Sequence, residues 1–159
     1  MKSKAGFFLL IFLFMNLISC KEEKGYESSS FFDFGTKGMN ENTYYSFRPD
    51  SVFGNERLPR ECDVILTVRY TQDYEGESLL LNYEETSQSM DSILNGNLRL
   101  DLFPSSGYSV SHNMFPIHEL DTVIFRKVMV TDDFEISLFT PQEDSRGIKS
   151  IGVTFIESD

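Results

Sequence analysis

The sequence contains no tryptophan, and it is poor in cysteine, histidine and cationic side chains. Its 159 residues include only two cysteines, Cys20 and Cys62, and two histidines. One pair of cysteines cannot supply the multi-bridge framework of a small disulfide-rich domain, so the fold has to depend on a hydrophobic core. The missing tryptophan also removes the largest flat side chain on which a sugar ring could stack.

Positive charge is scarce as well, with 14 Lys+Arg against 25 Asp+Glu and a formal net charge of −11. Such a surface repels phosphate backbones, which argues against nucleic-acid binding. It also disfavours direct electrostatic docking on anionic lipid. The same excess of acid keeps a protein soluble, so charge alone names no partner.

Hydrophobic residues make up 40% of the chain and aromatic residues 14%, which is the composition of a folded protein. The length suits one domain of ordinary size.

The first 20 residues, MKSKAGFFLLIFLFMNLISC, carry the strongest signal. Lys2 and Lys4 precede an apolar run from Phe7 to Ile18. That run is shorter than the roughly 20 residues of a spanning helix and fits the apolar region of a signal peptide. It ends in Leu17-Ile18-Ser19-Cys20, which resembles the lipobox of bacterial lipoproteins.

We therefore expect residues 1–19 to be a lipoprotein signal peptide, cut before Cys20, with palmitate or similar acyl chains on Cys20. Two or three chains would anchor the protein to a membrane far better than one. The mature segment would then carry a net charge of −13, because Lys2 and Lys4 leave with the signal. The alternatives are an ordinary signal peptide with a chance cysteine, or an uncleaved anchor.

The segment Lys21-Glu22-Glu23-Lys24 follows. It resembles the acidic surface-export signal of lipoproteins in the Bacteroidetes group, and it could equally be a hydrated spacer. Residues 20–42 as a whole, with their serine run and glycines, are expected to form a tether. The Phe31-Phe32-Asp33-Phe34 cluster is unusual in a tether, and it either docks as an edge strand or forms an apolar patch for a partner.

From Thr43 onward apolar side chains recur with a period of two, which predicts strands in a domain spanning 43–159. A turn is expected at Asn95-Gly96, and a short helix is possible over Glu85 to Leu94. A loop is expected over about 104–116. The segments that alternate most clearly are 62–70, 79–84, 98–102, 121–130, 134–139 and 151–156.

Short strands joined by turns, without long crossover helices, predict an all-β fold with antiparallel sheets. Each strand has one apolar face that a second sheet must cover. We therefore expect a two-sheet β-sandwich, either a jelly roll or an immunoglobulin-type sandwich.

Candidate catalytic and metal-binding groups are few. His112 and His118 lie near Glu119 and Asp121 and could in principle hold a divalent cation, but their spacing is not that of a helical zinc motif. The acid pairs Glu84-Glu85, Asp132-Asp133 and Glu143-Asp144 could supply glycosidase carboxylates or calcium ligands, and they could equally face water.

Two further groups complete the candidates. Tyr44, Tyr45 and Tyr108 are possible sugar platforms, although packing within the domain would also explain them. Cys62 is expected to be a small buried apolar residue and not a nucleophile. We assign no catalytic residue, no metal site and no cofactor.

Three stretches of the chain match the pattern of a known family. They are Val64-Ile65-Leu66-Thr67-Val68-Arg69-Tyr70 with the following Asp73-Tyr74 and Leu79-Leu80-Leu81, then Phe125-Arg126-Lys127-Val128 leading into Phe134-Glu135-Ile136-Ser137-Leu138, and last Gly147 to Glu157. Together they resemble the gliding motility lipoproteins of the H type (GldH) of Bacteroidetes. The resemblance covers about 60–159, with 85–120 poorly matched because the family's tryptophan-bearing segment has no counterpart.

The resemblance implies a non-enzymatic lipoprotein of the outer membrane, linked to the gliding and type 9 secretion machinery. Only the lipidated cysteine carries over from the family, to Cys20. We therefore expect a lipid-anchored protein of the cell outer membrane that supports an envelope protein complex. The alternatives are a surface lipoprotein that binds glycans or another ligand and, third, a small hydrolase.

Overall fold

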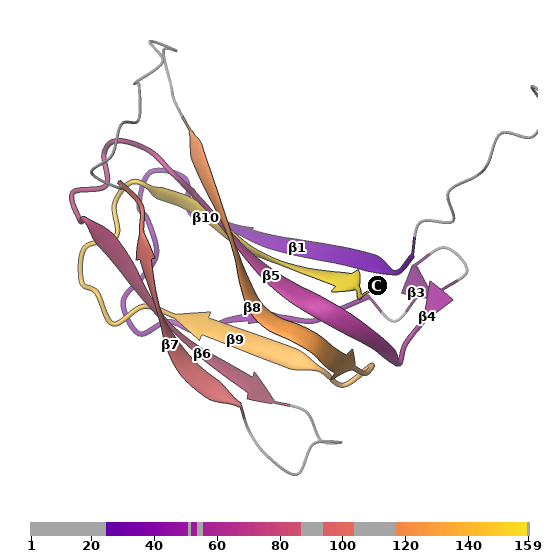
Figure 1. The fold of residues 1–159 in the computed structure, drawn as a ribbon. Coiled ribbons are helices and arrows are strands. Elements are labelled where there is room, and N and C mark those ends of the chain that lie inside the picture. Colours follow the sequence, from indigo (N-terminus) through magenta and orange to yellow (C-terminus); the bar gives the residue numbers. More distant parts are fainter. Residues whose placement is uncertain (1–24, 51, 54–55, 87–93, 104–116, 159) are drawn as a thin grey trace, which may run out of the picture.

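A computed structural model describes residues 25–50, 52–53, 56–86, 94–103 and 117–158 (Figure 1). Over these ranges the chain forms β-strands and no helix, which confirms the all-β prediction. The strands are β1 (Glu27–Asp33), β2 (Tyr45–Phe47), β3 (Val52–Phe53), β4 (Glu56–Arg57), β5 (Arg60–Tyr70), β6 (Ser78–Thr86), β7 (Asn95–Asp101), β8 (His118–Val130), β9 (Glu135–Phe139) and β10 (Ile148–Glu157).

Two antiparallel four-stranded sheets make up the body, with strand orders β1-β10-β5-β8 and β2-β9-β6-β7, and β3 pairs with β4 in a separate hairpin. The main strands pair as if one long ribbon had been folded back on itself: β1 with β10, β2 with β9, β5 with β8 and β6 with β7. A ribbon wrapped in this way into two facing sheets is a jelly roll, so the structure selects that topology over the immunoglobulin type.

The period-two alternation decides which side chains enter the core. On β5, Val64, Leu66 and Val68 are fully buried, and the register places Val153 and Phe155 of β10 beside them on the same face. Leu79 and Leu81 of β6 are equally buried in the opposite sheet. Burying a side chain of this size contributes about 1.5–3 kcal/mol, so the facing apolar rows supply most of the driving force for folding.

Aromatic contacts join the two sheets at both sides of the sandwich. The ring of Phe32 on β1 lies 5.1 Å from that of Phe47 and 5.4 Å from that of Tyr45, both on β2. Tyr83 of β6 meets Phe125 of β8 edge to face at 5.4 Å. These contacts place β1 over β2 and β8 beside β6, so the sandwich is closed by rings at either side.

The strands expected at 62–70, 79–84, 98–102, 121–130, 134–139 and 151–156 all correspond to observed strands. The turn expected at Asn95-Gly96 is wrong, because both residues lie in β7 and pair with β6. Gly96 is needed there for packing, since a Cβ at this position would come within 2.5 Å of the Tyr83 hydroxyl. Of the possible helix over 85–94, Glu85 and Thr86 belong to β6, and 87–93 lie outside the described residues.

The N-terminal part of the sandwich lies inside the range expected to be a tether. Of the two alternatives for the Phe31–Phe34 cluster, the structure shows the edge strand, since β1 pairs along its whole length with β10. The ordered body therefore begins by Tyr26, which is fully buried, and not at residue 43.

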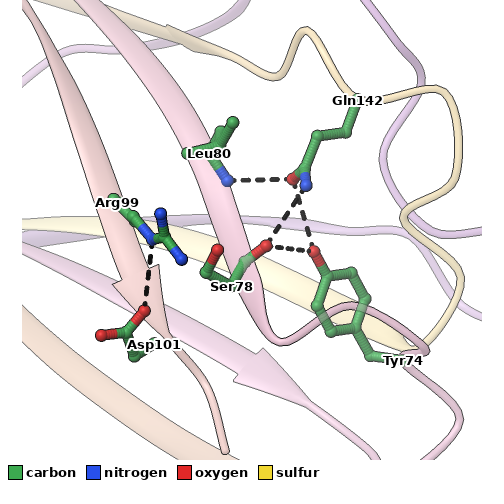
Figure 2. Close-up of polar contacts among 6 residues, drawn as sticks. All are labelled: Tyr74, Ser78, Leu80, Arg99, Asp101 and Gln142. Atoms are coloured by element: carbon green, nitrogen blue, oxygen red, sulfur yellow. Dashed lines mark hydrogen bonds and ion pairs between the residues drawn. The ribbon is translucent and has the colours of Figure 1, made fainter.

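The polar side chain of Gln142 completes the edge of β6 where β9 has ended. β9 pairs with β6 only from Asn82 onward, which leaves the backbone of Ser78 and Leu80 without a strand partner on that side. The Gln142 amide supplies two of the missing bonds: Leu80 N donates to its Oε1 at 2.9 Å, and its Nε2 donates to the Ser78 carbonyl at 3.2 Å. Figure 2 shows this arrangement, with the Tyr74 hydroxyl donating to the same carbonyl at 2.9 Å.

Replacing Gln142 by alanine should lower the free energy of unfolding by about 1 kcal/mol, because the Leu80 N–H loses its acceptor and the Ser78 carbonyl keeps only the Tyr74 hydroxyl as a donor. Urea denaturation would measure the change. Glu143→Ala, at the exposed neighbouring position, should have no effect. Equal stability of the two variants would contradict a structural role for the Gln142 amide.

Candidate functional site

The residue with the clearest predicted role, Cys20, lies outside the described residues, but the structure shows where the chain that follows it enters the body. Tyr26 is 0% exposed, and its hydroxyl donates to the Asp50 carbonyl at 2.5 Å. Its backbone N–H donates to Glu157 Oε2 at 3.0 Å, and its carbonyl accepts from Glu157 N at 2.8 Å. Burial raises the pKa of Tyr26 to about 12, so the phenol stays protonated and keeps donating.

This attachment point limits the distance between Cys20 and the folded body. Tyr26 follows Cys20 by six residues. Whatever their conformation, so few residues span at most about 20 Å, whereas a tether ending at residue 42 would span up to roughly 75 Å. The chain that leads from Cys20 therefore enters the sandwich at the end formed by the start of β1 and the end of β10 (Figure 1).

No helix in the described ranges is long and apolar enough to span a membrane. Cys62 is buried and unpaired, and burial raises the pKa of its thiol to about 11. A thiol that stays protonated and out of solvent is a poor nucleophile, which agrees with the packing role expected from the sequence.

The structure separates the residues that were considered as a metal site. His112 lies outside the described residues. His118 opens β8 with its ring 5.3 Å from that of Tyr70, whereas Glu119 points to the other face of the sheet and pairs with Arg69 at 2.7 Å. Asp121 accepts from the Thr67 hydroxyl at 2.7 Å. Within the described residues no cluster of three or more His, Cys, Asp or Glu side chains could hold a metal ion.

Two of the acid pairs organise turns. Asp144 accepts from both the backbone and the guanidinium of Arg146, at 3.0 and 2.8 Å, and these bonds lower the pKa of its carboxyl to about 2. Asp133 accepts from the Thr131 hydroxyl at 2.5 Å in the turn between β8 and β9. Bonds of this kind stabilise the turns, and this explains the two carboxylates without a catalytic or calcium-binding role.

The third acid pair behaves differently. Glu84 and Glu85 point to opposite faces of β6, so Glu84 is half-exposed, while Glu85 faces the core and is 0% exposed. Among the described residues neither carboxylate oxygen of Glu85 has a hydrogen-bond partner of regular geometry, and only the backbone of Leu94 lies close enough to favour its charged form. Burial, together with the negative charge of Asp133, raises the pKa of the Glu85 carboxyl. The sequence could not reveal this, because an inward Glu has the same place in the alternation as an inward Leu.

The tyrosines considered as sugar platforms have different environments. Tyr45 is buried in the core, and its hydroxyl accepts from Asn40 N at 3.0 Å. Tyr44 is 56% exposed, and its ring packs on that of Phe139 at 4.5 Å with a 39° tilt. The register continues this row across the sheet from Phe139 to Asn82 and then to Asn97. Tyr108 lies outside the described residues.

The outer face of the other sheet carries a cluster that sequence analysis missed. Phe31 of β1 lies over Gly152 of β10, where a Cβ would come within 2.2 Å of its ring. The Arg69 guanidinium sits 4.7 Å from the centre of the same ring and also pairs with Glu119. A glycine in the middle of an apolar strand is the available signal for such a close approach.

These contacts join three strands on a solvent-facing surface. A cation over an aromatic ring contributes about 0.5–1 kcal/mol at an exposed site. Phe31 nevertheless remains 39% exposed, so the cluster holds β1 in place and still presents an apolar ring to solvent.

Comparison with known protein families gave no match, and comparison with curated proteins gave none either.

Glu85→Gln should raise the free energy of unfolding at pH 7 by about 1 kcal/mol, because it replaces a buried, unpartnered carboxylate with a neutral amide of the same shape. The folded state favours the protonated acid, so it binds more protons than the unfolded state and wild-type stability falls as pH rises above the ordinary glutamate value of 4.5. The advantage of the variant should therefore shrink on acidification and vanish below that pH.

Denaturation curves from pH 4 to 8 would measure this trend, with Glu84→Gln on the solvent face as the matched control. A pH-independent difference between wild type and Glu85→Gln would contradict the assignment of Glu85 as a carboxylate buried without compensation.

Proposed function

We propose that this chain is a non-enzymatic lipoprotein of the outer membrane, anchored by acyl chains on Cys20, whose jelly-roll body supports an envelope protein complex of the gliding or type 9 secretion kind. The observation that carries the proposal is the buried, hydrogen-bonded Tyr26 so soon after Cys20. If Cys20 is lipidated, the buried Tyr26 follows the anchor by only six residues, a far shorter span than a tether ending at residue 42.

The proposed mechanism is positional. A body held within about 20 Å of its anchor samples a thin layer above the bilayer, so its effective concentration toward other membrane proteins is high without new contacts. The net negative charge keeps the body itself off anionic headgroups. The lipid would therefore supply the attachment, and the exposed surface of the sandwich would remain available to partners.

The surroundings of the candidate catalytic carboxylates support the non-enzymatic part of the proposal. A glycosidase needs two acids across a cleft, about 5–9.5 Å apart. Asp133 and Asp144 are bonded to neighbours in their own turns, and Glu85 is buried away from solvent on the face opposite Glu84. One member of each pair is thus bonded within its own turn or buried, and the hydrolase alternative draws no support from these three carboxylates.

Cys20→Ala should move the protein from the outer-membrane fraction to the soluble fraction, because no acyl chain can then be attached. Mass spectrometry of the wild-type protein should find an N-terminal peptide that begins at residue 20 and carries fatty acid. Cys62→Ala, which also removes a thiol, should remain in the membrane fraction. A membrane-bound Cys20→Ala protein would contradict the anchoring proposal.

The short distance to the anchor can be tested separately from anchoring itself. A spacer of about 20 Gly/Ser residues inserted after Lys24 would add on the order of 25 Å of flexible chain. We expect this variant to be lipidated and membrane-bound. After mild crosslinking, however, fewer gliding or secretion components should be purified with it than with the wild-type protein. The same spacer added after Asp159 is the control, and equal recovery from both would exclude a role for proximity.

A second candidate function, glycan binding, is favoured by one observation: the exposed ring of Tyr44 packed on Phe139, in a row that continues with the amides of Asn82 and Asn97. A ring flanked by amides can stack on a sugar and bond to its hydroxyls. If the chain binds a polysaccharide, Tyr44→Ala should weaken that binding by about tenfold. A polysaccharide binding screen would test it, with the exposed Thr86→Ala on the same sheet as control.

A further inference from the structure

The edge of β1 differs from the other sheet edges in the described structure. The two sheets have four edge strands, β1, β8, β2 and β7. An edge strand presents unpaired backbone N–H and C=O groups, which can template pairing with another chain unless the edge is short, bulged or charged.

Three of these edges carry such protection. β2 is only three residues long. β7 is charged and carries Arg99 and Asp101 close to its end. β8 is bulged against β5, with register shifts between Cys62 and Ile65 and a positive φ of 51° at Lys127.

β1 is neither short nor bulged, and its only charged residues, Glu27 and Asp33, lie at its two ends. Its sequence, Glu-Ser-Ser-Ser-Phe-Phe-Asp, contains no lysine or proline, and its seven residues pair with β10 in unbroken register. The strand is therefore regular along its whole length, as a template for a further strand must be.

Hydrogen bonds at the two ends of β1 show which backbone groups face outward. Glu157 N donates to Tyr26 O at 2.8 Å, and Phe34 N donates to Lys149 O at 2.8 Å. The even-numbered residues therefore point their backbone groups at β10, and in an antiparallel pair the residues between them point the other way. Ser29, Phe31 and Asp33 thus direct their N–H and C=O groups away from β10, the only strand that pairs with β1 in the described structure.

The beginning of the strand is covered on its inward face, where Tyr26 and Ser28 are buried, whereas Glu27 is exposed. The backbone of Asp50 lies against the start of β1, where it accepts from the Tyr26 hydroxyl and donates to the Ser28 hydroxyl at 2.9 Å. Beyond this point the residues of β1 are exposed or half-exposed, with Phe31 and Phe32 at 39% and 38%. An edge with an apolar centre, open backbone groups and an acid at each end is therefore left between Glu27 and Asp33.

Charge decides between a second copy of this chain and a different partner. If β1 paired with β1 of a second copy over its whole length, its outward-facing residues would oppose one another, and Glu27 of each copy would lie opposite Asp33 of the other. Like charges directly opposite one another are destabilising, and two-fold symmetry doubles the penalty. The same acids at the two ends would attract a strand with basic residues at both of its own ends.

We propose that the open edge of β1 binds an extended segment of a partner protein, which adds a fifth strand to this sheet and places basic residues opposite Glu27 and Asp33. The backbone pairing would supply affinity, and the end charges with the exposed Phe31 ring would supply selectivity. The proposal rests on the proposed function in that it gives the envelope partner a docking surface and a chemistry.

The test uses the full-length chain in detergent and two synthetic peptides as probes: Lys-Thr-Val-Thr-Val-Thr-Lys and its acidic twin Glu-Thr-Val-Thr-Val-Thr-Glu. We expect the basic peptide to bind at least about tenfold more tightly by fluorescence anisotropy. On binding, the backbone amides of Ser29, Phe31 and Asp33 should exchange their hydrogen more slowly. Docking on a sheet face would leave those amides unchanged.

Three variants of β1 make the result decisive. Ser29→Pro removes an outward N–H without breaking a bond to β10, so it should weaken binding of the basic peptide by about tenfold. Ser29→Ala keeps that N–H and should bind the basic peptide as tightly as the wild type does. If Ser29→Pro lowers the unfolding midpoint, Asp33→Lys serves instead, since this exposed substitution leaves the backbone intact and should shift preference toward the acidic peptide. Equal binding of both peptides to wild type would overturn the proposal.

A dimer in sedimentation velocity that Ser29→Pro dissociates would also overturn it, in favour of a second copy. Failure of the proposed function is distinguishable, because peptide binding in detergent does not require lipid on Cys20. If the wild-type protein proves to carry no acyl chain but still prefers the basic peptide, the anchoring proposal is contradicted and the edge-binding proposal stands.

Discussion

The pairing of the first described strand with the last is the interaction on which the rest of the structure depends. β1 joins β10 along seven residues, and Tyr26 and Glu157 lock the pair at one end. That pairing closes the outermost turn of the jelly-roll ribbon, because β2 and β9, β5 and β8, and β6 and β7 follow inside it. It also carries the chain from the neighbourhood of Cys20 straight into a sheet.

The attachment of β1 combines backbone and side-chain terms. On one face, Phe31 fills the space above Gly152 and is held by Arg69. On the other, Phe32 enters the seam with Tyr45 and Phe47. A strand gripped from both faces resists fraying, although it lies at an edge and near the N-terminus, where order is usually lost first. The consecutive phenylalanines are thus explained by period two: one for each face of the sheet.

Much of the fold was predictable from the sequence, because inward residues such as Val64, Leu66 and Val68 recur with the period of a strand. The sheet order was not, since alternation says which face a residue takes and not which strand lies beside it. The turn predicted at Asn95-Gly96 was wrong because a glycine can also be required for close packing, as Gly96 is beneath the Tyr83 ring. The candidate site divides in the same way. A lipobox is a local motif, whereas the Phe31–Gly152–Arg69 cluster joins residues from three distant parts of the sequence and appears only after folding.

The adjacency of the two ends of the body has a practical consequence for how the molecule is oriented. Tyr26 and Glu157 bond to each other, so the C-terminal strand finishes beside the point where the chain from Cys20 enters (Figure 1). With Cys20 lipidated as proposed, the carboxyl terminus would face the bilayer, and the loops around Gly147, at the opposite end of β10, would point outward. A reporter domain fused to the C-terminus would therefore be crowded between body and lipid, while an epitope grafted near Gly147 would be presented to solvent.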